Sequence, residues 1–573
     1  MLLKLAALFV CILLHKNVFC KPHNDLNNII RNVEDIIRQS QDDLRYKPET
    51  EGLGLPAAGG GGAAADLGET VNPTTGSPWP LPQQIKTTTS MLFLNKVFKF
   101  NYDSKTCDLL QMAFTRYYNL IFYGTQQVPS NIENSTFRLP KVNEPSISSM
   151  IVTMDICPDY PTLESNENYT LSVASDGARI KAATIWGVLR GLETFSQLIY
   201  ESSDGGLAVN ATTITDFPRF LHRGILVDTS RHFIDVPTLL DNFDAMVYNK
   251  FNVFHWHIVD DQSFPYESSK YPQLSNWGAF DQRHTYTQDQ VSLVISYARE
   301  RGIRVVPEYD TPGHSQSWGS INDLLTPCYK DGKATGSFGP INPILNSTYD
   351  ILKDFFGEVV AKYPDHYIHM GGDEVSFDCW KSNPDITAFM KEQQFGDDYA
   401  KLEEYYMQRL LDIMSDLQAG YIIWQEVIDN GVKVRNDTVV EVWKGGYVQE
   451  MSKVTKQGYR TILSSPWYLN YVSNPYNQDW KTYYIIEPQD FTGTAEQKAL
   501  VIGGEACMWG EYVDSVNLIQ RLWPRASAVG ERLWSSKSVN DVPAATSRLA
   551  EHRCRMLRRG IQAEPVTGPG YCP

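Results

Sequence analysis

The chain is short of positive charge. It contains 51 lysines and arginines against 67 aspartates and glutamates, which gives a formal net charge of -16 at pH 7. Nucleic acid and anionic membrane surfaces repel a protein of this charge, so we expect neither as a partner. Carboxylates repel one another less once they are partly protonated, so the acidic excess favours an acidic working compartment.

Apolar runs long enough to cross a membrane are also missing. Residues 1–20 carry Lys4, followed by an apolar run from Leu5 to Leu14. That run is too short to span a bilayer and is typical of a cleavable secretory signal peptide. We therefore expect no membrane span and a lumenal or secreted protein. Residues 21–75 contain a glycine- and alanine-rich tract, which predicts a flexible or processed segment.

Unpaired cysteines should be scarce in such a protein. Two of the nine cysteines fall in the signal peptide, and the remaining seven allow three disulfides and one free thiol. Proximity along the chain predicts the pairs Cys107 with Cys157, Cys328 with Cys379, and Cys554 with Cys572. Cys507 lies in an apolar strand pattern and is expected to be the free thiol.

Five Asn-x-Ser/Thr sequons predict a glycoprotein. In a secreted chain such sites mark exposed loops. The five asparagines are Asn134, Asn168, Asn210, Asn346 and Asn436.

At 573 residues the chain is too long for one ordinary core, so at least two domains are expected. Residues 76–215 read as a small α+β domain. Short alternating runs at 96–100, 149–154 and 169–173 predict an antiparallel sheet, and residues 185–200 have the apolar spacing of an amphipathic helix lying against it. These residues contain no cluster of acids or nucleophiles, so we assign the domain a structural role.

Residues 216–573 repeat a strand, loop and helix rhythm. The expected strands lie at 224–228, 252–259, 303–308, 367–371, 421–425, 439–442, 461–464 and 501–505. The helices between them include 236–248, 287–301, 348–363 and 399–417. Eight strands over this length predict a (β/α)8 TIM barrel as the catalytic domain. A doubly wound open sheet is the alternative, but no glycine-rich phosphate-binding motif follows the first strand.

The sequence YIHMGGDEV (367–375) places two adjacent carboxylates, Asp373 and Glu374, where a buried strand ends. Side chains alternate along a strand, so the two acids cannot act on one atom unless the backbone kinks, which Gly371 and Gly372 permit. If Glu374 donates a proton, Asp373 orients something else. Such a pair can also be merely solvated or cap the next helix, and only the surrounding pattern argues against that.

Other strand ends carry acids, tryptophans and an arginine. They include Asp228, Arg231, Asp260, Asp261, Glu308, His314, Trp424, Glu426, Trp443, Trp467, Tyr468, Trp509 and Glu511. Aromatic faces stack on the CH groups of a pyranose, and carboxylates bind hydroxyls and handle protons. A barrel mouth lined this way predicts a neutral sugar as ligand. Each of these tryptophans could instead belong to the core, and Arg231 could pair structurally with Asp228.

The combination of motifs resembles the β-N-acetylhexosaminidases of glycoside hydrolase family 20. The segments are HRGILVDTSRH (222–232), NVFHWHIVDDQSFP (252–265), YDTPGHSQSWG (309–319), HMGGDEV (369–375), WQEV (424–427), PWYLN (466–470) and GGEACMWGEYVD (503–514). Within that family they are most similar to the animal lysosomal α and β subunits. The resemblance covers about residues 76–573 and is highly specific.

The resemblance implies a retaining exo-glycosidase that removes terminal GlcNAc or GalNAc with help from the substrate's own acetamido group. By position, Glu374 resembles the general acid and then base, and Asp373 the residue that holds the acetamido N–H. His314 resembles a partner of the catalytic acid. We expect burial beside Asp373 to raise the pKa of Glu374, and an acidic optimum.

The resemblance also implies the sugar-binding residues. Arg231, Glu511 and Asp260 would hold the 3- and 4-hydroxyls. Trp424, Trp443 and Trp509 would surround the acetamido group, and Tyr468 would donate to its oxygen. The segment departs from the α-subunit pattern after PWYL, where Asn470 is followed by Tyr471 in place of arginine. We therefore expect neutral sugars to be preferred over 6-sulfated ones.

A metal-dependent hydrolase is a weaker interpretation. His255 and His257 form an H-x-H on one strand face, a spacing that metal-dependent barrel hydrolases use. The usual partners on later strands are missing, because His369 precedes GGDE and the last strand ends in Glu505. We expect no metal and no cofactor. The resemblance implies a homodimer. A glycosidase with a protein nucleophile and a non-catalytic sugar-binding protein remain as alternatives.

Overall fold

The computed structural model describes residues 71–125, 140, 144–471, 478–568 and 571–572. The predicted signal peptide, most of the segment 21–75 and the sequon at Asn134 lie outside these residues. Thr74, placed by the sequence in that segment, bonds α18 (Val542–Arg558): its backbone N–H donates to Ser547 and its hydroxyl to Glu551. Among the described helices, none combines the length and apolar character needed to cross a bilayer.

A six-stranded sheet precedes the barrel. Its strands follow the order β1-β2-β4-β3-β6-β5. Their bounds are β1 (Gln84–Tyr102), β2 (Ser146–Ile156), β3 (Tyr169–Ala174), β4 (Gly177–Thr184), β5 (Tyr200–Glu201) and β6 (Leu207–Asp216). The prediction of a purely antiparallel sheet is wrong, because β2 runs parallel to both β1 and β4. Helix α3 (Asp108–Tyr123) connects β1 to β2, which lets the chain return in the same direction.

Helix α4 (Ile185–Leu198) lies where it was predicted, but it has no solvent-exposed face. All of its residues are buried. The sheet covers one side, and the other side contacts the barrel, where Arg190 Nη2 donates to the carbonyls of Phe251 and Gly302 and Gln197 donates to that of Tyr248. A helix enclosed on both sides needs polar residues that find partners, which explains its buried arginine and glutamine.

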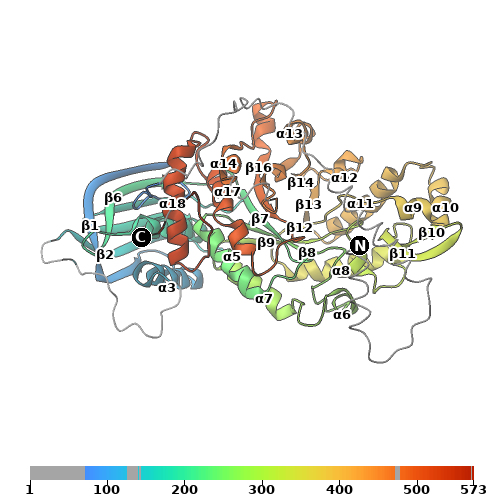
Figure 1. Cartoon of the computed structure of the whole chain (residues 1–573), viewed down its shortest axis with the longest axis horizontal. Helices are drawn as coiled ribbons and strands as arrows, with labels where there is room; N and C mark the ends of the chain where they lie inside the picture. Colours follow the sequence, from blue (N-terminus) through green and yellow to red (C-terminus); the bar gives the residue numbers. More distant parts are fainter. Residues whose placement is uncertain (1–70, 126–139, 141–143, 472–477, 569–570, 573) are drawn as a thin grey trace, which may run out of the picture. The chain divides into compact units, whose positions relative to one another are not determined.

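Eight parallel strands close into a barrel in the order β12-β13-β14-β15-β16-β7-β8-β9 (Figure 1). Their bounds are β7 (His222–Asp228), β8 (Val253–Val259), β9 (Arg304–Tyr309), β12 (Tyr367–His369), β13 (Gly420–Trp424), β14 (Val439–Val442), β15 (Arg460–Leu463) and β16 (Val501–Met508). Each overlaps a predicted strand. The (β/α)8 barrel is therefore confirmed, and the open doubly wound sheet is wrong.

Helices follow the strands as predicted. The four expected helices are α5 (Val236–Tyr248), α7 (Gln288–Arg299), α8 (Asn346–Lys362) and α11 (Tyr399–Asp416). Local chemistry fixes two of their starts. The Asp235 carboxylate accepts from the Thr238 N–H, and Thr287 and Gln290 form a reciprocal capping box. Such caps satisfy backbone donors that the first helical turn leaves unpaired.

The lower interior of the barrel is an apolar floor. It is formed by inward side chains of seven strands, namely Val253, Val306, Tyr367, Ile422, Val439, Ile462 and Ile502, which pack with Leu163. These residues are all buried. On five of the strands, the next inward position toward the carboxyl end carries a histidine, a glutamate or a tryptophan, so the floor supports a polar layer.

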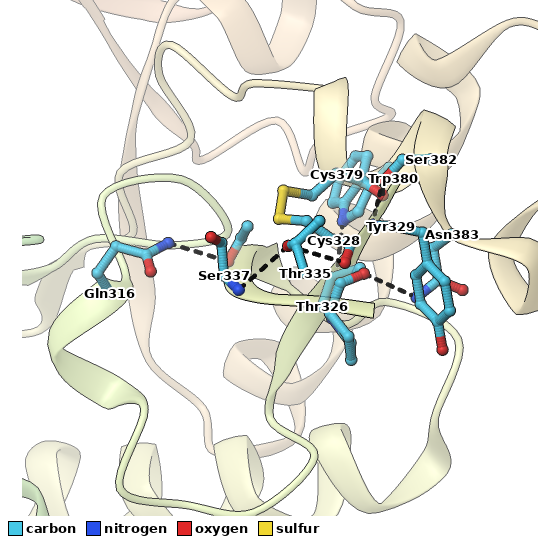
Figure 2. The surroundings of a disulfide bond; sticks show 12 residues. Gln316, Thr326, Cys328, Tyr329, Thr335, Ser337, Cys379, Trp380, Ser382 and Asn383 are labelled. Carbon is cyan, nitrogen blue, oxygen red and sulfur yellow. Dashed lines mark hydrogen bonds between the residues drawn. A yellow bond between two sulfur atoms is a disulfide. The ribbon is translucent and has the colours of Figure 1, made fainter. Parts of the chain in front are cut away.

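Three disulfides are present, Cys107–Cys157, Cys328–Cys379 and Cys554–Cys572, and Cys507 is a buried free thiol. These are the pairs that proximity in the sequence predicts. Figure 2 shows Cys328, on the hairpin formed by β10 (Leu325–Lys330) and β11 (Lys333–Ile341), joined to Cys379 at the start of α9 (Asp378–Ser382). The Tyr329 N–H donates to Ser382 in the same contact. This disulfide links the loop that follows β9 to the loop that follows β12.

Three of the four described sequons have exposed asparagines, Asn168, Asn346 and Asn436. Asn210 differs from the expectation of an exposed loop. It lies within β6, is half-buried, and accepts a hydrogen bond from the Tyr200 hydroxyl.

Candidate active site

The loop after β12 carries Asp373 and Glu374 to the carboxyl end of the barrel. Gly371 and Gly372 both have positive φ, 65° and 97°. A Cβ at Gly371 would meet the Asp310 carboxylate at 1.8 Å, and one at Gly372 would meet the Val427 side chain at 2.4 Å. Glycine is therefore required at both positions. The kink predicted from these glycines is present.

The two adjacent acids have different surroundings. Asp373 is buried, whereas the side chain of Glu374 is 57% exposed. Burial raises the pKa of Asp373. The prediction of a raised pKa for Glu374 is wrong: contact with His314 lowers it, and Lys444 and Arg231 add to that effect. Glu374 has φ 48°, in the left-handed region that residues other than glycine rarely adopt.

His314 joins both acids to a third carboxylate. Its Nδ1 lies 3.2 Å from Asp260 Oδ1, and its Nε2 lies 3.6 Å from Glu374 Oε2 and 3.7 Å from Asp373 Oδ2. Burial alone would lower the pKa of His314, but Asp260 and Asp373 raise it well above the usual value. His314 is therefore an imidazolium placed between the carboxylates, and its charge favours their ionised forms.

Asp310 is a member of the site to which the sequence argument assigned no role. It follows β9 directly, and its Oδ1 accepts from the Gly372 N–H at 3.1 Å. Burial and the nearby Asp373 raise the pKa of Asp310 well above its usual value. Carboxylate oxygens of Asp310 and Asp373 lie within 4.8 Å of each other, so the ionised form of either group disfavours ionisation of the other. The signal in the sequence was an acid two residues after the strand predicted at 303–308.

Arg231 is held by two carboxylates. Its Nη1 donates to Asp228 Oδ2 at 2.8 Å, and its Nη2 lies 2.7 Å from Asp260 Oδ2. Its Nε donates to Gln262, and Glu511 lies 3.9 Å from Nη1. Within the described chain, one N–H on each terminal nitrogen remains available. The pairing with Asp228 considered from the sequence is present, and it orients a guanidinium that still has two donors.

Four aromatic side chains cluster beside the acids, and we refer to this cluster as the aromatic pocket of the proposed site. They are Trp424, Trp443, Tyr468 and Trp509, with Leu226 and Cys507 behind them. Neighbouring ring centroids lie 6.2 to 6.4 Å apart. Burial raises the pKa of Tyr468 well above its usual value, so its hydroxyl keeps its proton and can donate it in a hydrogen bond.

Buried carboxylates orient two of these indoles. Trp424 Nε1 donates to Glu308 Oε1 at 2.8 Å, and Trp443 Nε1 donates to Glu426 Oε2 at 2.7 Å. Lys444 pairs with the other oxygen of Glu426 at 2.8 Å. An indole whose N–H is fixed in this way presents one defined face to the pocket. The sequence placed Glu308 and Glu426 at strand ends but could not show what they bind.

Asn470 and Tyr471 lie at the outer side of this pocket. Tyr471 is 67% exposed, and its ring stacks on that of Tyr468 with centroids 6.1 Å apart. Asn470 Oδ1 is buried and has no hydrogen-bond partner among the described residues. The rim therefore offers an uncharged aromatic face and one amide oxygen.

The two histidines of the H-x-H motif point into the barrel, as their spacing predicts. His369, set aside in the sequence argument, also stacks on His255, with ring centroids 4.6 Å apart. Ligand atoms of His255, Glu308 and His369 lie within 4.8 Å of one another. Both nitrogens of His255 are hydrogen-bonded to carboxylates, so in this arrangement the ring has no lone pair for a metal.

Two family models match the chain. The model described as the catalytic domain of glycosyl hydrolase family 20 matches residues 220–537. A second model, described as β-acetyl hexosaminidase-like, matches residues 78–198. The two matches fall on the barrel and on the small sheet with its helices.

Individual proteins show the same similarity. The chain is 53% identical over 503 residues to β-hexosaminidase subunit beta of Felis catus, covering 86% of this chain and 93% of that protein. It is 52% identical over 507 residues to β-hexosaminidase subunit alpha of Bos taurus, covering 86% and 94%. The solved structure of Flavobacterium johnsoniae chitobiase matches with a TM-score of 0.73 at 30% identity, covering 85% of this chain and 73% of that one.

Proposed function

The chain belongs to glycosyl hydrolase family 20 and is a β-N-acetylhexosaminidase, and we propose that Asp373 and Glu374 carry out its reaction. The observation that carries this proposal is the placement of a buried and an exposed carboxylate beside a cluster of aromatic side chains. The substrate is a glycan, glycolipid or chitooligosaccharide that ends in β-linked GlcNAc or GalNAc.

In the first step the acetamido oxygen of the sugar attacks the anomeric carbon. Glu374 gives its proton to the departing glycosidic oxygen, the bond from C1 to that oxygen breaks, and a cyclic oxazolinium ion forms. Asp373 accepts the acetamido N–H and stabilises the positive charge of the ion. Its burial suits this role, because a carboxylate shielded from water interacts more strongly with a nearby cation.

In the second step water opens the oxazolinium ion. Glu374, now ionised, takes a proton from the water as its oxygen bonds to C1. The bond between C1 and the acetamido oxygen breaks, and the configuration at C1 is retained. The exposed side of Glu374 suits both steps, since it must meet the leaving group and then water.

The pocket residues hold the rest of the sugar. Trp424, Trp443 and Trp509 enclose the acetamido methyl group, and the Tyr468 hydroxyl donates to the acetamido oxygen. The two available N–H groups of Arg231 bind the 3- and 4-hydroxyls, with Glu511 accepting from them. His314 Nε2, 3.6 Å from Glu374 Oε2, attracts that carboxylate by its charge.

The rim supports a preference for uncharged sugars. Tyr471 offers no cation for a 6-sulfate, and the neutral amide of Asn470 beside it cannot balance an anion. We propose that neutral GlcNAc and GalNAc glycosides are hydrolysed faster than their 6-sulfated forms. A faster rate on the sulfated aryl glycoside would contradict this.

The similarity to these relatives supports two further proposals, on assembly and on location. The named relatives are subunits, and by resemblance we propose a homodimer that enters the secretory pathway. Light scattering of the purified protein tests whether it is a homodimer. Detection in lysosomes or in the culture medium tests whether it enters the secretory pathway.

Comparing two substrates tests the mechanism. An aryl β-GlcNAc and the matching aryl β-glucoside differ only in the acetamido group. We expect the first to be hydrolysed about a thousandfold faster, because only it contains the attacking oxygen. A thiazoline that mimics the cyclised intermediate should inhibit competitively, and equal rates on the two glycosides would exclude the mechanism.

A further inference from the structure

Above the apolar floor, histidines and carboxylates alternate in one chain of contacts. His255 Nε2 and His257 Nδ1 both bond Glu308 Oε2, at 3.0 and 2.5 Å. His257 Nε2 bonds Asp260 Oδ2 at 3.1 Å, and Asp260 Oδ1 faces His314. We name His255, Glu308, His257, Asp260 and His314 the charge chain. It runs from the barrel interior to the imidazole that touches Glu374.

The hydrogen bonds define the protonation of this chain. An ionised carboxylate only accepts, so a ring nitrogen bonded to one must carry a proton. His257 meets carboxylates at both nitrogens and is therefore an imidazolium. His255 is in the same position, because its Nδ1 bonds Glu505 Oε1 at 2.6 Å. Positive and negative groups thus alternate from His255 to His314.

The pKa shifts agree with this charge pattern. Burial alone would lower the pKa of His257, but Glu308 and Asp260 raise it to about 9. Burial alone would raise the pKa of Glu308, but His257 and His369 lower it well below its usual range. His314 and Arg231 likewise lower the pKa of Asp260, although its burial alone would raise it.

We propose that His257 and Glu308 are positioning residues for the acid–base step, acting on Glu374 through Asp260 and His314. His257 and Arg231 both bind Oδ2 of Asp260, which leaves Oδ1 directed at His314. Glu308 also accepts the indole N–H of Trp424 at 2.8 Å. One buried carboxylate therefore fixes the acetamido pocket and the acid–base group in a single arrangement. This inference rests on the proposed role of Glu374.

Several charged groups face the members of the chain. Those that face His257 are Glu308 from β9, Asp260 after β8 and Asp228 from β7. Those that face His314 are Asp260, Asp310, Asp373 and Glu374, and those that face Glu374 also include Lys444 and Arg231. Removing the cation at position 257 leaves an excess of negative charge among them. Carboxylates near a lost cation bind protons more readily, so the pH optimum should move upward.

Two variants of His257 separate its contacts. In His257→Asn the amide can replace Nδ1 and keep the bond to Glu308, and in His257→Gln it can replace Nε2 and keep the bond to Asp260. Both remove the charge. The control is His552→Gln on α18, which removes another fully buried imidazole whose Nε2 bonds Asn249 at 3.0 Å.

The measurement is kcat and KM for an aryl β-GlcNAc between pH 3 and 8, with circular dichroism and Tm as checks of folding. We expect both His257 variants to move the pH optimum up by about half a unit or more, and to lower kcat about tenfold while KM changes much less. His552→Gln should lower Tm and keep the wild-type pH profile. Unchanged pH profiles for both His257 variants would overturn the proposal. A shift confined to His257→Asn would overturn it too, because His257→Gln, which loses the bond to Glu308, would then behave like the wild type.

Two further measurements keep the test decisive. If the His257 variants do not fold, neutron diffraction of the wild-type protein near pH 7 should show deuterium on both ring nitrogens of His257, and a singly protonated ring would overturn the proposal. Glu374→Gln in the same assay separates the two claims. If it retains full activity the proposed function fails, whereas an inactive Glu374→Gln beside unshifted His257 variants refutes only this inference.

Discussion

The apolar floor and the strand members of the charge chain occupy alternate inward positions of β8 and β9. On β8, Val253 belongs to the floor and His255 to the chain, and on β9 Val306 and Glu308 are related in the same way. The strands and the burial are the same, and only the partners differ. The floor needs nothing beyond close packing, whereas each group of the chain needs a partner of opposite charge. We therefore expect the floor to govern stability and the layer above it to govern turnover.

The largest effect on turnover should come from the mouth, above both layers. Asp373→Asn removes the charge that we propose stabilises the oxazolinium ion, and we expect kcat to fall by about a thousandfold. Stability should change little, because burial already disfavours the ionised form of Asp373. Steady-state kinetics and thermal unfolding check this, and retention of more than a tenth of wild-type kcat would contradict it.

Within the charge chain, Glu308→Gln should have the next largest effect. The amide cannot accept from Trp424, His255 and His257 together, so one of these contacts is lost. We expect kcat to fall by about 10-fold to 100-fold, as when other partners of catalytic groups are removed. A wild-type kcat in a folded Glu308→Gln variant would show that Glu308, like the apolar floor, does not affect turnover.

The pH profile tests the charges of the mouth. Asp373 must be ionised and Glu374 protonated, and the pKa of Asp373 lies above its usual value while that of Glu374 lies below. The rate should fall at low pH as Asp373 is protonated and at higher pH as Glu374 loses its proton. We expect an acidic optimum and a decline of about tenfold per pH unit on its alkaline side. A flat rate from pH 4 to 8 would contradict these assignments.

A substitution at the rim should have a smaller effect than Asp373→Asn or Glu308→Gln. Tyr471→Arg introduces a cation beside Tyr468, on which Tyr471 stacks. We expect the ratio of 6-sulfated to neutral aryl glycoside hydrolysis to rise a few-fold, about what an exposed ion pair provides. Tyr471→Phe is the matched control, since it keeps the ring and adds no charge, and an equal rise in that variant would refute the explanation.

The floor should give the smallest effect on turnover. Val306→Ala removes two methyl groups from a fully packed site and should lower the free energy of unfolding by about 2 kcal/mol. Its kcat and pH profile should match those of the wild type. Denaturant unfolding and the same aryl glycoside assay check this, and a shifted pH profile would show that the two layers do not act separately.

Much of this arrangement could be predicted from the sequence. Eight strand patterns, the glycines before Asp373 and the aromatic residues at strand ends are local signals, and each one identified its element. The sheet was predicted as antiparallel because alternation along a strand does not reveal the direction of its neighbours. The pKa of Glu374 was predicted with the wrong sign because its exposure and its contact with His314 depend on a loop that is distant in sequence.

The sequence by itself determined the barrel and the three disulfide pairs and singled out Asp373 and Glu374 as candidates, because strand periodicity, cysteine spacing and motif order are properties of neighbouring residues. Only the tertiary structure decided which of these acids is buried, that Asp310 lies beside Asp373, and that His257 and Glu308 connect Trp424 to Asp260 and His314. Those features depend on groups from different strands meeting inside a closed barrel, where the low dielectric makes each contact strong. Local sequence patterns do not predict contacts of this kind.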